Sequence, residues 1–247
     1  MHRFFVSPES ISESQVTFPD YVSYQLNKVF RSKKGDECII FDGNNIEYLV
    51  QLETVNSTKS FGTIIEAVKC SRESDVKLIL YQALIKPDRF EYAIQKSVEL
   101  GIHKIVPLVS NRTEYPNPSS SRMKRWENIV RESAEQSHRT ILPVIDMPVN
   151  LNQALKESPK ASIIPWEMEK TRGIKEVLKI IKKDFIDDDM QIGIFIGPVG
   201  GFDPKEINFA IDNNVIPVSL GARILRSETA AVVASTAILY EFGNLGG

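Results

Sequence analysis

Short apolar runs separated by turn residues occupy the chain up to about residue 72. The segments "CIIFDGN" and "IEYLVQLETV" are typical of β-strands, and the turn "DGNN" at residues 42–45 between them indicates a hairpin. A further strand is expected in "KSFGTIIEAVKC". A helix is expected around residues 20–31, ending before the basic turn "KKGD" at residues 33–36. The pattern predicts a small, barrel-like β domain.

The pattern changes near Val76, after which strand-like runs alternate with segments of helical period. Residues 87–100 are typical of a helix, because Pro87 can begin it, Gly101 can end it and its apolar positions share one face. Strands are expected in "VKLILYQAL", "HKIVPLV", "LPVIDM", "ASIIPWE", "QIGIFIG" and "VIPVSLG", and helices in "SSRMKRWENIVRESAEQSH" and "SETAAVVASTAILYEFG". Such alternation predicts an α/β fold with a mostly parallel sheet.

The loop "GPVGGFDPKEI" at residues 197–207 directly follows a buried-strand candidate. Its glycines allow a ligand to approach the main chain closely. Asp203 is a favourable helix N-cap, with Pro204 at the first helical position and Glu206 at the third. Ligands of open α/β sheets bind at the carboxyl ends of the strands, where this loop is expected. The loop matches neither a P-loop nor a G-x-G-x-x-G fingerprint, and a turn that binds nothing stays an alternative.

A second stretch, "SLGARILRSETAAVVAS" at residues 219–235, repeats this layout of strand end, glycine, short loop and helix. Arg223, Arg226, Glu228 and Thr229 fall in a segment that otherwise reads as buried. Buried charges must be paired or functional, so either an Arg–Glu pair holds the loop or these side chains contact a ligand. The small residues that follow favour close helix packing, within the chain or against a second subunit.

Composition and charge narrow the classes of function. The net charge of −2 provides no general basic field, so a nucleic acid would need a local basic patch. Cys38 and Cys70, without a signal peptide or an apolar run of membrane-spanning length, indicate reduced thiols in a cytoplasmic protein. His2, His103 and His138 are scattered, so no metal site is expected.

Six segments in this order resemble the ribosomal RNA small-subunit methyltransferase E family of the SPOUT (trefoil-knot) class, over essentially the whole chain. They are "RFFV", "VFRSKKGDE", "IQKSVELGIHKIVPL", "ESAEQSHR", "IGPVGGFDPKEI" and "LGARILRSETAAV". The resemblance implies a PUA-like RNA-binding β-barrel domain at residues 1–72 and a SPOUT trefoil-knot α/β domain at residues 73–247. It also implies a homodimer that methylates N3 of a uridine in 16S rRNA of the assembled 30S subunit, with S-adenosyl-L-methionine as the cofactor.

The cofactor is expected to contact both glycine loops and the strand end "PWE", through main-chain groups that suit adenine and apolar side chains that suit its faces. The expected contacts are Pro165, Glu167, Gly197, Pro198, Gly200, Gly201, Leu220, Gly221, Ile224, Leu225 and Thr229.

Arg226 is the first candidate for catalysis, since a guanidinium can hold a uracil anion or a phosphate. A structural pair with Glu228 is the alternative. Glu135 and Arg139 are further catalytic or substrate-contact candidates, with a solvated helix end as the alternative.

In the first domain, Arg3, Arg31, Lys33 and Lys34 are candidates for RNA phosphate contacts, which position an RNA without reading its sequence. A solvated basic turn is the alternative.

Two other functions stay open: a SPOUT enzyme acting on another RNA, and an RNA-binding or assembly module that no longer catalyses. The N-terminal domain and "SAEQSHR" favour the small-subunit family over the first. Val199 stands where the family usually has a glutamate, which removes an acceptor beside the cofactor and favours the second.

Overall fold

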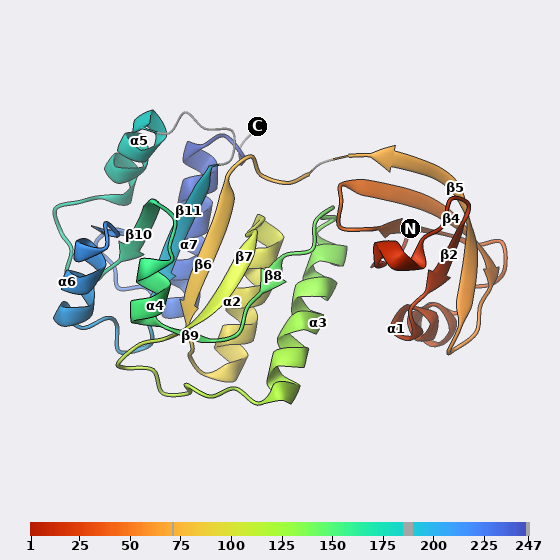
Figure 1. The fold of residues 1–247 in the computed structure, drawn as a ribbon, viewed down its shortest axis with the longest axis horizontal. Helices are drawn as coiled ribbons and strands as arrows, with labels where there is room; N and C mark the ends of the chain where they lie inside the picture. The colour runs from red at the N-terminus through yellow and green to blue at the C-terminus, as the bar shows by residue number, and fades with distance from the viewer. Residues whose placement is uncertain (71, 185–189, 246–247) are drawn as a thin grey trace. The chain divides into compact units, whose positions relative to one another are not determined.

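The computed structural model describes residues 1–70, 72–184 and 190–245, which form two compact units (Figure 1). The first unit comprises Met1–Glu73 together with Ala134–Leu142, and the second comprises the intervening and following chain. The sequence analysis assigned residues 134–142 to the second domain, whereas the structure groups them with the first unit. Nothing in the periodicity of that segment indicates its tertiary partners.

The first unit is built on a five-stranded sheet with the order β1-β3-β4-β5-β2. Strand β1 pairs parallel with β3, and the other neighbours pair antiparallel. The predicted hairpin is present as β3 and β4, joined by the turn at residues 42–45. Strands β1 and β2 were not anticipated, because three or four residues are too few to display an alternation. The bounds are Arg3–Phe5 for β1, Gln15–Phe18 for β2, Glu37–Phe41 for β3, Ile46–Thr54 for β4 and Ser60–Lys69 for β5.

The predicted helix of the first unit begins at Asp20 and runs as α1 to Tyr24, then continues as a π-helix, η2, over Gln25–Val29. It ends near Arg31, whose φ of 55° is in the left-handed region. Leu26 joins a buried cluster with apolar side chains of β1, β2, β3 and β4. A short 3₁₀ helix, η1, covers Pro8–Ser10.

The strands of the second unit form a parallel sheet with the order β12-β10-β11-β6-β7-β8, and β9 also pairs with β7. The alternation read from the sequence is confirmed, and this parallel sheet is typical of the SPOUT class. The threading of the chain as a knot stays a prediction. The bounds are Lys77–Ala83 for β6, Lys104–Val109 for β7, Val144–Ile145 for β8, Val149–Asn150 for β9, Ala161–Pro165 for β10, Gln191–Ile196 for β11 and Ile216–Val218 for β12.

Helices cover both faces of this sheet, which is why its central strands are apolar runs and not alternating ones (Figure 1). Helices α2, α5 and α7 pack together on one side, and α4 and α6 contribute to a buried cluster on the other. Helix α2 ends at Gly101 as predicted, with φ of 104°. The bounds are Pro87–Leu100 for α2, Ser120–Gln136 for α3, Leu151–Lys156 for α4, Ile174–Asp184 for α5, Pro204–Asp212 for α6 and Ser227–Glu241 for α7.

Candidate active site

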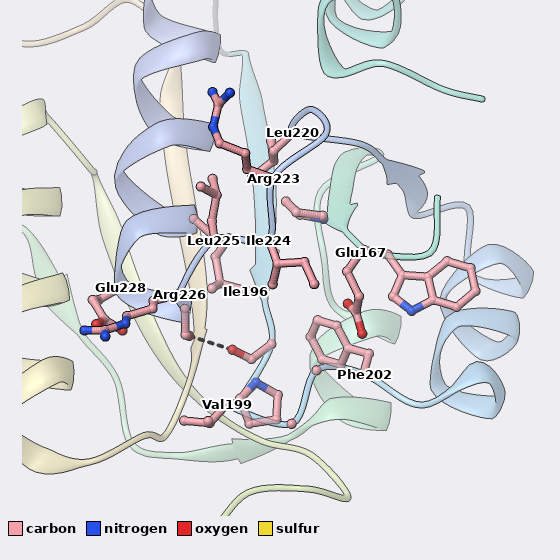
Figure 2. A pocket seen from close by; sticks show the side chains of 18 of the residues that line it. Glu167, Ile196, Val199, Phe202, Leu220, Arg223, Ile224, Leu225, Arg226 and Glu228 are labelled. Atoms are coloured by element: carbon pink, nitrogen blue, oxygen red, sulfur yellow. Dashed lines mark hydrogen bonds between the residues drawn. The ribbon is translucent and has the colours of Figure 1, made fainter. Parts of the chain in front are cut away.

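A cavity of about 410 Å³ lies in the second unit, where three strands end (Figure 2). Its walls come from residues 165–167 at the end of β10, residues 196–202 at the end of β11, and residues 219–228 and 230 after β12. These three strands are neighbours in the parallel sheet, so their carboxyl ends meet at one edge. Arg89 of α2 completes the lining. The sequence prediction that the two glycine loops lie together is therefore confirmed.

The turn from β11 into α6 has the predicted capping box. The Asp203 carboxylate accepts hydrogen bonds from the amides of Lys205, at 2.9 Å, and Glu206, at 3.0 Å. In return, Glu206 Oε2 accepts one from the Asp203 amide at 2.9 Å. A hydrogen bond from Asn111 is the largest of several that lower the pKa of Asp203. Gly201 has φ of 66°, and this fixed backbone explains why a glycine is needed there.

The segment after β7 holds the glycine loop in place. Arg112 Nη1 donates to the Gly200 carbonyl at 2.7 Å. The Asn111 amide donates to Glu206 Oε1 at 2.8 Å, and its Nδ2 donates to Asp203 Oδ2 at 2.8 Å. Sequence reasoning missed both residues. Their position directly after a parallel strand was the available signal, since that strand ends at the same edge of the sheet.

Ser227 connects the two loops. Its hydroxyl donates to the Gly197 carbonyl at 2.6 Å and accepts from Gln82 Nε2 at 2.9 Å. Gln82 lies fully buried on β6 and also donates to the Ala83 carbonyl at 3.0 Å. Neither residue was a candidate in the sequence analysis, although an amide within an otherwise apolar strand is a signal of a buried polar network.

The second loop is not buried, contrary to the expectation from its sequence. Ile224 is 86% exposed, and the side chains of Arg223, Arg226 and Thr229 are exposed as well. Of the four charged or polar candidates in this segment, Glu228 alone is buried, and it forms an ion pair with Arg89, at 3.8 Å from Nε to Oε1. The apolar residues of this segment line an open cavity, and the hydrophobic pattern of a sequence cannot distinguish a cavity lining from a buried core.

The cavity has the chemistry that an adenosyl ligand requires. Within the described ranges, the amide N–H groups of residues 222–225 donate to no protein group, and the Trp166 indole N–H is buried without a partner. Glu167 supplies a carboxylate next to Gly201, and Phe202 and Leu220 supply apolar walls. Unpaired main-chain donors, one carboxylate and apolar faces suit a nucleoside. All the predicted cofactor contacts line this cavity except Thr229, which lies outside it on the first turn of α7.

Known proteins resemble the chain over nearly its whole length. The RNA methyltransferase domain family matches residues 72–239, and the RNA methyltransferase PUA domain family matches residues 26–65. The ribosomal RNA small subunit methyltransferase E of Mesomycoplasma hyopneumoniae is 34% identical over 96% of this chain and 98% of its own. The chain belongs to the ribosomal RNA small subunit methyltransferase E family.

Two solved structures with the same fold support this conclusion. The enzyme from Neisseria gonorrhoeae, crystallised with S-adenosyl methionine, has 28% identity, a TM-score of 0.85 and 97% coverage of both chains. A putative methyltransferase from Legionella pneumophila, in complex with the same cofactor, has 28% identity, a TM-score of 0.86 and 96% coverage of both chains. In the described parts of this family member, no group of three or more His, Cys, Asp or Glu could hold a metal ion, and no helix could cross a membrane.

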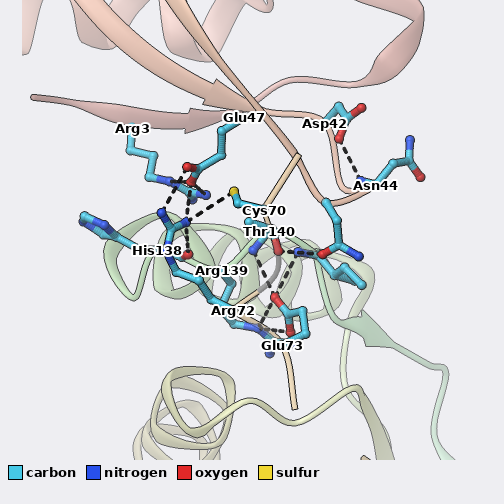
Figure 3. Close-up of polar contacts among 12 residues, drawn as sticks. Arg3, Asp42, Asn44, Glu47, Cys70, Arg72, Glu73, His138, Arg139 and Thr140 are labelled. Atoms are coloured by element: carbon cyan, nitrogen blue, oxygen red, sulfur yellow. Dashed lines mark hydrogen bonds and ion pairs between the residues drawn. The ribbon is translucent and has the colours of Figure 1, made fainter. Parts of the chain in front are cut away.

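Two catalytic candidates of this methyltransferase E chain belong to the first unit and do not line the cavity. Arg139 is 4% exposed and forms an ion pair with Glu73, with Nε 3.1 Å from Oε2 (Figure 3). Glu135 Oε1 accepts a hydrogen bond from the Phe5 amide at 2.9 Å. These contacts attach residues 134–142 to the first unit, and a substrate-contact role for the two side chains stays a prediction.

Arg3 is not available to contact RNA, which corrects its assignment as a phosphate ligand of this methyltransferase E chain. Its guanidinium is buried above the Phe41 ring, 4.2 Å from the centroid, and pairs with Glu47 (Figure 3). Burial alone raises the pKa of Glu47, but hydrogen bonds from Arg72 and Arg3 outweigh it and bring the pKa to about 2. By contrast, Arg31 and the two lysines at 33 and 34 are exposed.

Proposed function

We propose that the protein transfers a methyl group from S-adenosyl-L-methionine to N3 of a uridine in 16S rRNA of the assembled 30S subunit. The observation that carries the proposal is the cavity at three adjacent strand ends, with its unpaired main-chain donors and its two carboxylates, Glu167 and Glu228. Relatives named for small-subunit rRNA methylation, one of them crystallised with this cofactor, support it. A ribosomal substrate also favours a cytoplasmic location.

The cofactor supplies an electrophilic methyl group on a sulfonium. In our proposal, the loop at residues 220–225 holds the adenine through its main chain, and Glu167 accepts hydrogen bonds from ribose hydroxyls or the amino group. Arg112 and Ser227 keep the two loops at a fixed separation through their bonds to the Gly200 and Gly197 carbonyls. Such fixed positioning of two reactants contributes on the order of 7–11 kcal/mol to a two-substrate reaction.

Arg226 is the proposed anion-binding residue. It is the N-cap residue of α7 and lines the cavity, and its side chain has no hydrogen-bond or ion-pair partner among the described residues. A guanidinium there can stabilise the negative charge that develops on the uracil carbonyl oxygens when N3 loses its proton. We expect Arg226→Ala to keep cofactor affinity and to lose turnover.

The proposed RNA contact of the first unit centres on its basic turn. Arg31, Lys33 and Lys34 are exposed there, and the neighbouring Phe30 is 38% exposed with its ring stacked on His2 at a centroid distance of 3.6 Å. The left-handed backbone of Arg31 follows a π-helix, and both features are enriched at functional sites. Cations beside an exposed aromatic pair suit an RNA strand with an unstacked base.

A homodimer is the proposed assembly. Helix α7 packs its small residues inward and leaves Val233 and Tyr240 exposed at 36% and 69%. Light scattering on the purified chain tests this proposal, and a mass of one chain at micromolar concentration contradicts it.

The deciding experiment is methyl transfer from labelled S-adenosylmethionine to 30S subunits that lack the modification, followed by nucleoside mass spectrometry. Appearance of 3-methyluridine supports reaction and substrate together. No transfer, with the cofactor still bound in calorimetry, means a different RNA substrate. Absence of both transfer and binding supports a non-catalytic module.

Binding of 30S subunits at increasing salt concentration tests the basic turn. Lys33→Gln should reduce the salt dependence of binding because it loses a phosphate contact, whereas the control variant Lys179→Gln should leave the salt dependence unchanged.

A further inference from the structure

Glu228 is a buried carboxylate whose chemistry the cofactor site does not use. Glu228 lies in the first turn of α7, is 9% exposed as a whole residue, and lines the cavity. Its ion-pair partner is Arg89, at 3.8 Å, a distance at which charges attract but no hydrogen bond forms. The described part of the chain provides no hydrogen-bond donor to this carboxylate. The Glu228 side chain is 12% exposed and lines the cavity, so a ligand bound there can donate a hydrogen bond to this carboxylate.

Glu167, the other carboxylate of the cavity, lies away from Glu228. Figure 2 shows Glu167 and Glu228 on opposite sides of the pocket. Glu167 contacts the glycine loop, since a Cβ added at Gly201 would approach its Oε1 to 2.6 Å. Glu228 instead shares its side with guanidinium groups, those of Arg89 and Arg226. The cavity therefore has one acidic group near the proposed cofactor loop and another among cations.

The charged groups around Glu228 complement the hydrogen-bonding edge of uracil. Uracil presents an acceptor, a donor and an acceptor in order: O2, N3–H and O4. Carboxylates only accept hydrogen bonds and guanidinium groups only donate them, so an arginine–glutamate–arginine set complements this pattern. Cytosine has an acceptor at N3 and a donor amino group beside it, and would oppose the carboxylate with a lone pair.

We propose that Glu228 accepts the N3 proton of the target uracil, that Arg89 positions Glu228, and that Arg89 and Arg226 donate to the uracil carbonyl oxygens. The proposal rests on the proposed function, because it requires a uridine as the methyl acceptor. It adds a residue that selects the base and removes its proton.

The proton must leave before the methyl arrives, and the Glu228 carboxyl must then turn aside, because the proton, its acceptor and the incoming methyl all lie along the same in-plane direction at N3. N3 gives its proton to a Glu228 oxygen and keeps the electron pair, and the negative charge spreads onto O2 and O4. That electron pair then forms the bond to the methyl carbon while the carbon–sulfur bond breaks and its electrons stay on sulfur. The products are N3-methyluridine and a neutral thioether, and the proton passes from Glu228 to water.

The test compares single-turnover methyl transfer by wild-type protein and Glu228→Gln across pH, on 30S subunits lacking the modification. The charged groups that face the reaction are Arg89, Glu167, Arg223, Arg226 and Glu228. At neutral pH we expect a loss of about 100-fold or more in rate, the usual contribution of a general base. The deficit should shrink as pH rises, because hydroxide then removes the N3 proton. Calorimetric affinity for S-adenosylmethionine should not change.

A matched control removes a carboxylate of α2 outside the cavity. Glu91 pairs with Arg125 at 2.7 Å, and we expect Glu91→Gln to keep the wild-type rate and pH profile. If Glu228→Gln is unfolded in a thermal melt, Glu228→Asp and Arg89→Lys replace it. Each keeps its charge, and each should lower the rate with cofactor affinity retained and the pH profile of the wild type preserved.

Three results would overturn the assignment: an unchanged rate in Glu228→Gln, a deficit that is equal at every pH, or a rate loss that follows a proportional loss of cofactor affinity. The last two indicate a structural role. The product made by the wild-type protein tests the underlying function separately. A methylated nucleoside other than 3-methyluridine rejects the proposed function, whereas 3-methyluridine together with an active Glu228→Gln rejects only the role of Glu228.

Discussion

Replacing Gly201 by alanine should weaken cofactor binding far more than it weakens the fold. Gly201 has φ of 66°, a left-handed conformation that costs a residue with a Cβ roughly 1–2 kcal/mol. The new Cβ would also stand 2.6 Å from Glu167 Oε1, whereas an ordinary contact begins at 3.4 Å. The carboxylate must therefore withdraw from the glycine loop.

The two costs fall on different measurements. Backbone strain lowers the free energy of unfolding, and for a chain of this size each kcal/mol lowers the Tm by about 2–4 °C. The displaced Glu167 sits at the end of a flexible side chain, so its movement adds little to this loss. In the bound state, however, a hydrogen bond to a charged group contributes about 1.5–3 kcal/mol. Losing it raises the Kd for S-adenosylmethionine roughly 10- to 100-fold.

Gly101→Ala is the matched control. Gly101 also has a positive φ, 104°, but it ends α2 and no atom lies within 4 Å of an added Cβ. Both variants should therefore show a similar fall in Tm. Isothermal titration with S-adenosylmethionine should give a weaker Kd for Gly201→Ala alone. An unchanged Kd for Gly201→Ala, or an equal loss in both variants, would show that Glu167 and the loop do not form the cofactor site.

Three further predictions follow from the contacts. Glu47→Gln should remove part of the acid sensitivity of the first unit. The pKa of Glu47 in the folded protein, about 2, lies below the ordinary 4.5, so the ionised carboxylate stabilises the fold above pH 4.5 and this stabilisation is lost as the pH falls towards 2. Denaturation of both proteins followed from pH 6 to pH 2 measures the difference. Arg112→Ala should raise the Kd for the cofactor by removing the bond to the Gly200 carbonyl, and titration with an unaltered Kd would contradict that role. Arg139→Met should destabilise the first unit by about 1.5–3 kcal/mol in urea unfolding, because it removes the guanidinium from the half-buried Glu73 carboxylate, which keeps its hydrogen bonds from main-chain amides. A loss below about 0.5 kcal/mol would show that water replaces the guanidinium.

Local features of the structure were readable from the sequence because they depend on neighbouring residues. The end of α2 at Gly101 and the capping box of Asp203 and Glu206 require only near neighbours and the backbone preferences of glycine, proline and short polar side chains. The alternation of strands and helices likewise predicted a parallel sheet, and with it the edge where the two glycine loops meet. The resemblance of six segments to one family supplied the expected ligand and reaction.

The tertiary structure alone decided which charges are available for chemistry. Arg3 and Arg139 read as surface cations, but they are buried because distant carboxylates, Glu47 and Glu73, lie opposite them. The alternative role of Arg226, a pair with its neighbour Glu228, is not observed, because that carboxylate pairs with Arg89, from a helix far away in the chain. Ion pairs between elements depend on strand order and helix packing, which local sequence patterns do not encode. The sequence thus determined the elements and the loops, and the fold determined which of their side chains reach the cavity.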